Sequence, residues 1–217
     1  MNYSLIVQST YNEIQIALFQ DDTLLETVNE SKKTASKNIL LTLDALLKNH
    51  NLTINSIEYI GVNQGPAPFT TLRVLITTIN GIAFAEKIPL IGLNGLEAML
   101  AEHSNPHFPI TLCLYNAFSS DAYYGIKSSE DTMETGWNNI DELLQRIKKE
   151  FGQPIRAIGS GCTFFQDNIT KTLDNITIAS PLPQFPSMEF LHTLAQELFT
   201  QGQTEEQITP LYLKKAI

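Results

Sequence analysis

Three short stretches of the sequence combine residue types and spacings that could carry chemistry. The first is the loop from Gly65 to Thr70, which precedes a predicted helix, where free backbone N–H groups attract anions. Pro66 and Pro68 remove two of those donors, and the loop lacks the Gly-Lys-Ser/Thr ending of a phosphate-binding P-loop. The pattern therefore favours a rigid structural turn over a phosphate site.

The second stretch is the turn Gly159-Ser160-Gly161, which follows a predicted strand and could approach a phosphate or a base closely. So short a glycine pair is more typical of a plain strand-to-helix turn, and we interpret it as a degenerate nucleotide loop at most. Cys162 follows directly, but a thiolate nucleophile needs a nearby base or positive charge. Arg156 lies on the preceding strand, so a buried thiol is the better interpretation of Cys162.

The third stretch holds His103 and His107, whose spacing would suit a metal ion if both lay on one helix. Pro106 interrupts that helix, and no cluster of carboxylates or cysteines joins the pair. His50 and His192 are isolated and predict surface or packing roles. We therefore predict no metal site. Because the sequence has no Gly-x-Ser-x-Gly elbow and no zinc-protease motif, we also assign no catalytic residue.

The composition places the chain among globular proteins. It has 217 residues, 43% of them hydrophobic, which is enough apolar material for a core. Its 14 Lys and Arg residues stand against 23 Asp and Glu residues, so the formal net charge is −9. This acidity argues against a chain that binds nucleic acid without a partner protein, because binding to the phosphate backbone requires a basic surface. We also expect no membrane span, no secretory signal and, from only two cysteines, a cytoplasmic protein.

The N-terminal elements predict a sheet covered by helices. Alternating apolar residues and short apolar runs predict strands at 5–7, 14–19, 23–28 and 57–62. Stripes of apolar residues predict helices at 36–49 and 71–86. This order of three strands, helix, strand and helix indicates an α/β layered fold. It is typical of the ribonuclease-H-like half of an actin-like ATPase.

A second mixed block follows, so we predict two small lobes. Its predicted strands and helices lie at 110–114, 121–127, 139–151, 155–158, 164–173 and 176–179. Prolines at 181, 183 and 186 then mark a linker. We place the first lobe at 1–101, with a C-terminal helix at 187–202 packed on it, the second lobe at 102–186 and a tail at 203–217.

The helix predicted at 71–86 is apolar on almost every side. Leu72 and Ile79 lie in one stripe, while Leu75 and Ile82 add apolar surface elsewhere. A helix of this kind must be covered on two sides. Its own sheet can cover one side, and the other requires either the rest of this chain or a partner chain.

The stretch from Gly65 to Val74 resembles the Gly-Pro-Gly-Ser-Phe-Thr-Gly-Leu-Arg-Ile signature of the TsaB (YeaZ) family. An Ile-Pro-Leu-Ile-Gly run at 88–92 follows, as in that family, and the ending at 210–214 looks like its usual Pro-x-Tyr-Leu-Arg terminus. The resemblance covers nearly the whole chain and is most specific between 59 and 99. The signature residues are Gly65, Pro66, Phe69, Thr70 and Arg73.

Membership of this family implies an actin-like fold and a part in tRNA modification. TsaB is the non-catalytic paralogue of TsaD, the transferase that installs threonylcarbamoyl on adenosine beside the tRNA anticodon. The resemblance implies a scaffold subunit that dimerises with a TsaD-like transferase and is joined by a TsaE-like ATPase. Such a subunit would reach tRNA only through the complex and would have no cofactor of its own, with ATP or ADP at the interface of the complex. A homodimer of the isolated chain is left open.

The family pairs through its N-terminal helices, which would account for the apolar surplus of the helix at 71–86. Exposed apolar patches of more than a few hundred Å² usually mark such contacts. We therefore predict a partner interface on the helices at 36–49 and 71–86. The predicted interface residues are Leu40, Leu43, Leu47, Leu72, Leu75, Ile79 and Ile82.

Departures from the family pattern bear on catalysis. Two metal-binding histidines of TsaD correspond here to Gly95 and Met99, and neither can ligate that metal. The acidic residue common in the first phosphate turn is Gln8, which cannot serve as an acidic magnesium ligand. The alternative function, an actin-fold small-molecule kinase or ATPase, requires such acidic groups. A peptidase is a third alternative, for which the sequence offers no nucleophile–base pair.

Overall fold

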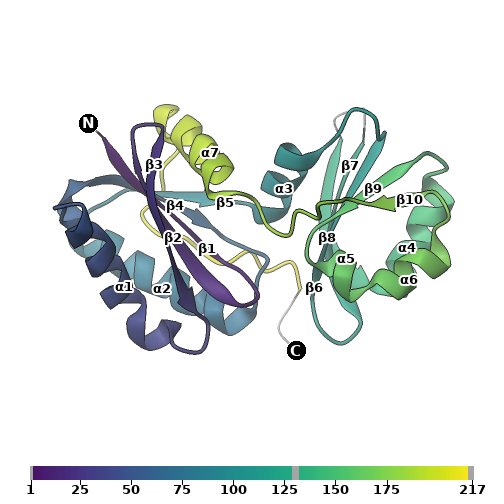
Figure 1. Ribbon diagram of the computed structural model, residues 1–217, viewed down its shortest axis with the longest axis horizontal. Coiled ribbons are helices and arrows are strands. Elements are labelled where there is room, and N and C mark those ends of the chain that lie inside the picture. Colours follow the sequence, from purple (N-terminus) through teal and green to yellow (C-terminus); the bar gives the residue numbers. More distant parts are fainter. Residues whose placement is uncertain (1, 129–131, 215–217) are drawn as a thin grey trace. The chain divides into compact units, whose positions relative to one another are not determined.

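Two five-stranded mixed sheets, each with its own helices, organise the chain in the computed structural model, which describes residues 2–128 and 132–214 (Figure 1). The first unit comprises the residues up to Asn94 together with Ser187–Leu211. The second unit comprises Gly95–Pro186 and the residues from Tyr212 onward. Each unit has its own hydrophobic core.

The sheet of the first unit joins an antiparallel meander to parallel strands. In the spatial order β3-β2-β1-β4-β5, its strands are β1 (Tyr3–Ser9), β2 (Glu13–Gln20), β3 (Thr23–Ser31), β4 (Ile57–Asn63) and β5 (Leu90–Leu93). β1, β2 and β3 pair antiparallel, whereas β4 is parallel to β1 and β5 to β4. Ile14, Ile16 and Leu18 all lie in the core, as their alternation along the strand predicts.

Helices pack against this sheet from two sides. α1 (Ala35–Asn49) and α2 (Phe69–Glu86) pack on each other and on β1, β2 and β3, while α7 (Met188–Thr200) packs on β1, β4 and β5 (Figure 1). A 3-10 turn, η1 (Ile54–Ser56), leads into β4. Gly61 of β4 lets α7 approach closely, because a Cβ there would lie only 2.9 Å from the Cβ of Ala195.

The second unit repeats this layered plan with a different strand order. In the spatial order β10-β9-β6-β7-β8, its strands are β6 (Ile110–Asn116), β7 (Asp121–Ser128), β8 (Met133–Asn139), β9 (Ile155–Ile158) and β10 (Ile176–Ile178). Its helices are α3 (Gly95–His103), α4 (Ile140–Glu150), α5 (Gly161–Phe164) and α6 (Gln166–Thr172). α3 lies on one side of the sheet, and α4 and α6 lie on the other (Figure 1).

The structure differs from the predicted lobes at two places. The boundary lies between Asn94 and Gly95 rather than after residue 101, because α3 packs on β6, β7 and β8 of the second unit. The prediction of a separate tail at 203–217 is wrong for residues 203–211, because these residues belong to the first unit. There Glu205 exchanges two backbone hydrogen bonds with Leu90, and so covers the open edge of β5. None of the helices in the described ranges is long and apolar enough to cross a membrane.

Candidate functional site

An apolar groove of about 670 Å³ runs between α1 and α2 in the first unit. Leu43 and Leu47 of α1 are buried at its base, and Ile82 of α2 is half-buried beside them. Leu40 stands at its rim with 56% of its surface exposed, and Leu41, the next residue on α1, is 68% exposed. Fully burying one leucine contributes about 1.5–3 kcal/mol, so this pair represents a substantial unused driving force for association.

The opposite wall of the groove is built from small residues. Thr77, Gly81 and Ala85 follow one another at intervals of four, which places them on one face of α2. A Cβ built on Gly81 meets no heavy atom within 4 Å. A small-residue face of this kind allows a further helix to pack close to α2, since the distance between packed helices depends on the side chains at the contact.

Charges at the groove are few and largely compensated. Lys48 and Asp44 form an i,i+4 ion pair of 2.7 Å on α1, with both side chains more than half exposed. Glu86 lies at the end of α2. Exposed ion pairs of this kind contribute little to stability, so the groove offers mainly apolar contact.

The structure divides the predicted interface residues into two sets. Leu40, Leu43, Leu47 and Ile82 line the groove. The other three, Leu72, Leu75 and Ile79, lie in the core of the first unit, where they are at most 4% exposed. Buried side chains cannot meet a partner, so the prediction is wrong for these three. Most of the apolar surplus of α2 is covered by α1 and the sheet within the same unit.

Two exposed apolar residues near this region were not predicted. Leu41 of α1 is 68% exposed, and Phe84 of α2 is 87% exposed. Gly81 was also missed. The sequence did offer a signal for Gly81, because a glycine inside a helix costs stability and usually has a packing or functional reason.

The signature loop is a well-braced turn at the start of α2. Gly65 adopts a φ of +104°, and its N–H donates to Oδ1 of Asn63 at 2.9 Å. A Cβ at Gly65 would lie 2.9 Å from Cδ2 of Leu72, so only glycine fits without a shift. The guanidinium of Arg73 stacks over the ring of Phe69 at 3.7 Å, while Thr70 is exposed. These contacts support the structural interpretation of the loop.

Neutral amides lie together at the ends of β1 and β4. Gln8 at the end of β1 is buried, and its Nε2 donates to Oε1 of Gln15 at 2.8 Å and contacts Sδ of Met188 at 3.3 Å. Asn63 donates from Nδ2 to Oε1 of Gln8 at 3.2 Å. Gln15 in turn donates from Nε2 to Oε1 of Glu13 at 3.0 Å, so the carboxylate nearest to this set is held by an amide.

The second turn brings its glycines against the backbone of β6. Gly159 has a φ of +92°, and a Cβ there would lie 2.4 Å from the carbonyl oxygen of Leu114. A Cβ on Gly161 would lie 2.7 Å from the same carbonyl group. Close packing of turn and strand therefore explains both glycines. Cys162 donates its S–H to the carbonyl of Ile158, and burial raises the pKa of its thiol to about 12, so the thiol is unreactive.

The two histidines of the third stretch are separated by the structure. α3 ends at His103, whereas His107 is exposed in the following loop. Burial lowers the pKa of His103, while Glu102, 3.4 Å away, acts in the opposite direction. Within residues 2–128 and 132–214, no three His, Cys, Asp or Glu side chains are grouped so that they could hold a metal ion.

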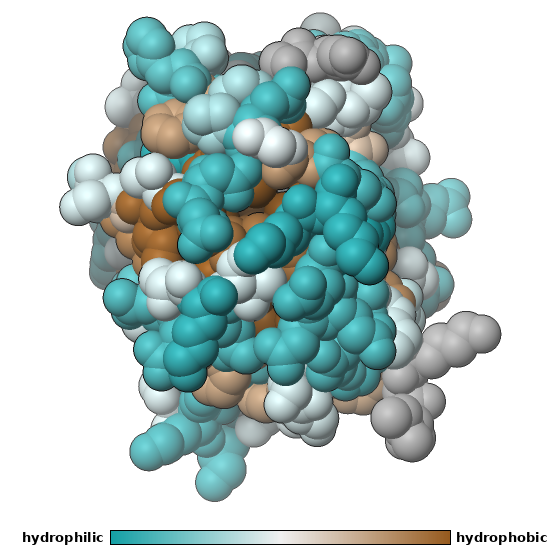
Figure 2. Space-filling view, turned by 90° about the vertical axis from the view of Figure 1, so that its right-hand side faces the viewer, coloured by the Kyte–Doolittle hydropathy of each residue, from teal (hydrophilic) through white to brown (hydrophobic). Residues whose placement is uncertain are grey.

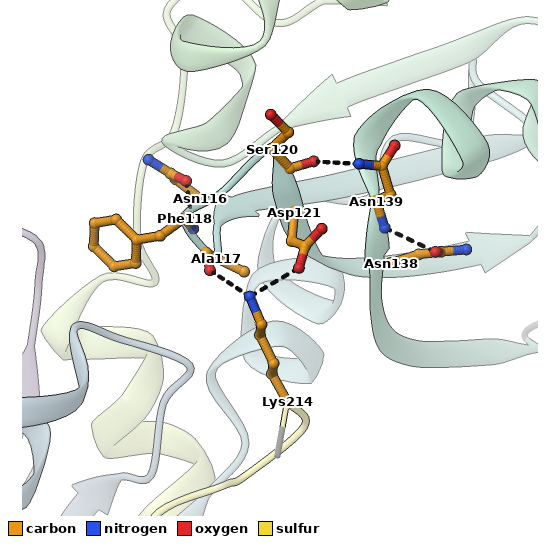
Figure 3. Close-up of polar contacts among 8 residues, drawn as sticks. All are labelled: Asn116, Ala117, Phe118, Ser120, Asp121, Asn138, Asn139 and Lys214. Atoms are coloured by element: carbon orange, nitrogen blue, oxygen red, sulfur yellow. Dashed lines mark hydrogen bonds and ion pairs between the residues drawn. The ribbon is translucent and has the colours of Figure 1, made fainter. Parts of the chain in front are cut away.

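Lys214 of the C-terminal signature is anchored on the turn between β6 and β7 (Figure 3). Its Nζ lies 2.8 Å from Oδ2 of Asp121 and donates to the carbonyl of Ala117 at 3.2 Å. It also lies 5.7 Å from the ring centre of Trp137. The turn it holds contains three successive residues with positive φ, at 118–120. These contacts give the terminal motif a structural role within the second unit.

The second unit offers a weaker interaction surface. On the side that carries this unit, the surface is mostly hydrophilic, with one apolar area set among polar side chains (Figure 2). Its large exposed apolar residues come from several separate elements rather than from one groove. They are Phe118, Met133, Trp137, Phe164 and Tyr212. The α1–α2 groove is therefore the stronger candidate site.

Solved structures place the chain in a known fold class. YeaZ from Pseudomonas aeruginosa superposes with a TM-score of 0.73, at 18% identity, over 98% of this chain and 100% of that one. A Bacteroides thetaiotaomicron protein described as having an actin-like ATPase fold and unknown function superposes with a TM-score of 0.54, at 12% identity, over 88% and 96% of the two chains. The chain has the actin-like ATPase fold, which confirms the prediction from the order of its elements.

Sequence comparison then identifies the family. Residues 25–191 match the family described as TsaD: tRNA N6-adenosine threonylcarbamoyltransferase. The tRNA threonylcarbamoyladenosine biosynthesis protein TsaB of Haemophilus influenzae is 23% identical over 205 residues, which cover 88% of this chain and 84% of that protein. The chain therefore belongs to the TsaD family, as a divergent member of its TsaB (YeaZ) branch.

Proposed function

We propose that this chain takes part in tRNA threonylcarbamoyladenosine biosynthesis as a non-catalytic subunit that binds a TsaD-like transferase through the α1–α2 groove. The observation that carries the proposal is the groove itself, in which the exposed Leu40 of α1 lies opposite a wall of small residues on α2. The names of the relatives support the process, because TsaB proteins are named for this biosynthesis and the matched family is named for the transferase.

The docking element would be a helix of the partner that lies against Gly81 and covers Leu40 and Leu41. Because Leu40 is 56% and Leu41 68% exposed, removing their remaining surface from water would together supply about 2–4 kcal/mol before the entropic cost of association. That gain suits a stable heterodimer when further contacts along the groove are added.

The contribution of the chain to the reaction would be conformational. Gly95 and Met99, both buried in α3, stand where the transferase carries metal-binding histidines, and neither can ligate that metal. Docking would stabilise the active form of the partner, which is a coupling free energy between the two proteins. In this role the chain would need no cofactor of its own, and ATP or ADP would bind at the interface of the complex. A TsaE-like ATPase and tRNA would bind to the complex rather than to this chain alone. The complex would act in the cytoplasm.

The test of the interface is Gly81→Phe, which fills the groove without touching the core. We expect the affinity of the full chain for the transferase to fall by at least about 100-fold, equivalent to about 2.7 kcal/mol. Gly152→Phe is the matched control, because Gly152 also has open space around it but lies in the second unit. Native affinity of Gly81→Phe would contradict the assigned interface.

The test of the process is deletion of the gene, followed by measurement of threonylcarbamoyladenosine in bulk tRNA. We expect the modification to fall and to return when the wild-type gene is restored, but not with Gly81→Phe. An unchanged level in the deletion strain would contradict the proposed function as a whole.

A further inference from the structure

A small polar cavity lies on the α7 side of the first sheet. Its volume is about 140 Å³, and it lies where α7 crosses the amino ends of β1 and β4. Ser4, Tyr59, His192 and Gln196 contribute to its walls. At about 30 Å³ per water molecule, the space holds four or five waters or one organic molecule of similar size.

His192 is the most informative group in this cavity. Its ring is 4% exposed and stacks on Phe19 with 4.0 Å between the ring centres, yet neither ring nitrogen forms a hydrogen bond with any described residue. Burial also lowers the pKa of His192, so the ring is neutral near pH 7 and one of its nitrogens can accept a hydrogen bond.

Tyr59 adds a second unsatisfied group to the same wall. Its hydroxyl is enclosed and makes no hydrogen bond within the described part of the chain. Burial raises the pKa of Tyr59, so its hydroxyl is neutral near pH 7. An enclosed hydroxyl that has no partner among the described residues indicates that the cavity beside it is occupied in solution.

The charges around the cavity select the class of occupant. Asp21 and Glu58 are among its lining residues, and no lysine or arginine is among the described ones. Phe199 stacks on Tyr59 with 4.6 Å between ring centres and supplies an aromatic surface. Carboxylates and an acceptor nitrogen disfavour an anion, whereas a cation that donates hydrogen bonds is attracted by both and by aromatic rings.

We infer that this cavity binds a small primary ammonium ion, about the size of ethylammonium, which donates a hydrogen bond to His192 and faces the carboxylates of Asp21 and Glu58. The inference does not rest on the proposed function, because the cavity and the α1–α2 groove share no lining residue.

The test is a titration of the ¹⁵N-labelled full chain with ethylammonium chloride. Binding is monitored through the amide chemical shifts of Ser4, Tyr59 and Thr200. We expect saturable shifts with ethylammonium and none with sodium chloride or ethanol. His192→Phe keeps the stacked ring but removes the nitrogens, and we expect it to weaken binding at least about tenfold. His107→Phe, at an exposed position in the second unit, is the control and should bind as the wild type does.

Glu58→Gln is the second variant, because Glu58 is exposed and its replacement leaves the core intact even if His192→Phe fails to fold. We expect Glu58→Gln to weaken ethylammonium binding about threefold. Three results would each overturn the inference. They are no saturation with ethylammonium, equal binding of ethanol, or an affinity for ethylammonium that is unchanged both in Glu58→Gln and in His192→Phe. The first of these would mean that the cavity holds only water.

Discussion

The two faces of the first sheet are covered in different ways. On the α1–α2 side, the buried layer is complete, but Leu40 and Leu41 remain on the surface beside an open groove. On the α7 side, aromatic stacking between Phe19 and His192 closes the contact and encloses polar groups instead. The difference teaches that one face of the sheet leaves apolar side chains exposed, whereas the other leaves a polar hydroxyl, that of Tyr59, without a partner among the described residues.

The largest expected effect on stability distinguishes a buried position on the groove side of the sheet from an exposed one. Leu75→Glu places a carboxylate in a fully buried position and should destabilise the first unit by more than about 4 kcal/mol. Leu41→Glu, on the exposed face of α1, should change stability by less than about 0.5 kcal/mol. Urea unfolding of both variants checks this contrast. Equal stabilities would show that α2 is not packed as described.

The next effect belongs to the α7 side and depends on pH. The pKa of His192 is lowered in the folded state, so the unfolded chain binds the proton more readily, and stability should fall as the pH drops below about 6.5. Asp22 opposes the shift but does not cancel it. His103 acts with the same sign, so unfolding of wild type and His192→Phe from pH 7.5 to 5 must be compared. Parallel curves for the two proteins would refute a contribution from His192.

A smaller effect on stability is expected at Gly81, in the wall of small residues on α2. Gly81→Ala should stabilise the protein by about 0.5–1 kcal/mol, because alanine is the better helix former and its Cβ meets no neighbour. Thermal unfolding measures the gain. A loss of stability would mean that the space beside Gly81 is already filled, and the comparison between the two faces would then fail.

The smallest effect concerns the charged rim of the groove. Asp44→Ala breaks the exposed ion pair with Lys48 and should cost less than about 0.5 kcal/mol. Chemical unfolding at low and high salt checks this value. A larger loss at low salt would show that the rim of the groove is held by charge rather than by apolar packing.

The sequence predicted the layered fold because the relevant patterns are local. The alternation in β2 and the apolar stripe of α1 each specify both an element and its buried face. β8 was missed because Met133–Asn139 has no apolar alternation, and its pairing with β7 supplies the strand conformation instead. The helix predicted at 164–173 corresponds to α6 (Gln166–Thr172), whereas the short α5 (Gly161–Phe164) before it was missed.

The candidate sites were harder to predict than the fold. Periodicity identified α2 as apolar all round, but it cannot say which neighbour covers each face, so Leu75 was assigned to the interface although it is buried. His192 gave no signal in the sequence, because its importance comes from Phe19, which lies far away along the chain. A site formed by segments that lie far apart in the sequence can be recognised only when the tertiary contacts between those segments are known.

The path of the chain through the two units sets the order in which they can fold during synthesis. The second unit is almost continuous in sequence, whereas the first unit needs α7 and the segment up to Leu211, both of which are made after it. While the ribosome is still making the second unit, β5 has an uncovered edge and the sheet lacks α7. The first unit therefore cannot complete its fold, and keeps part of its core exposed, until the residues up to Leu211 have emerged.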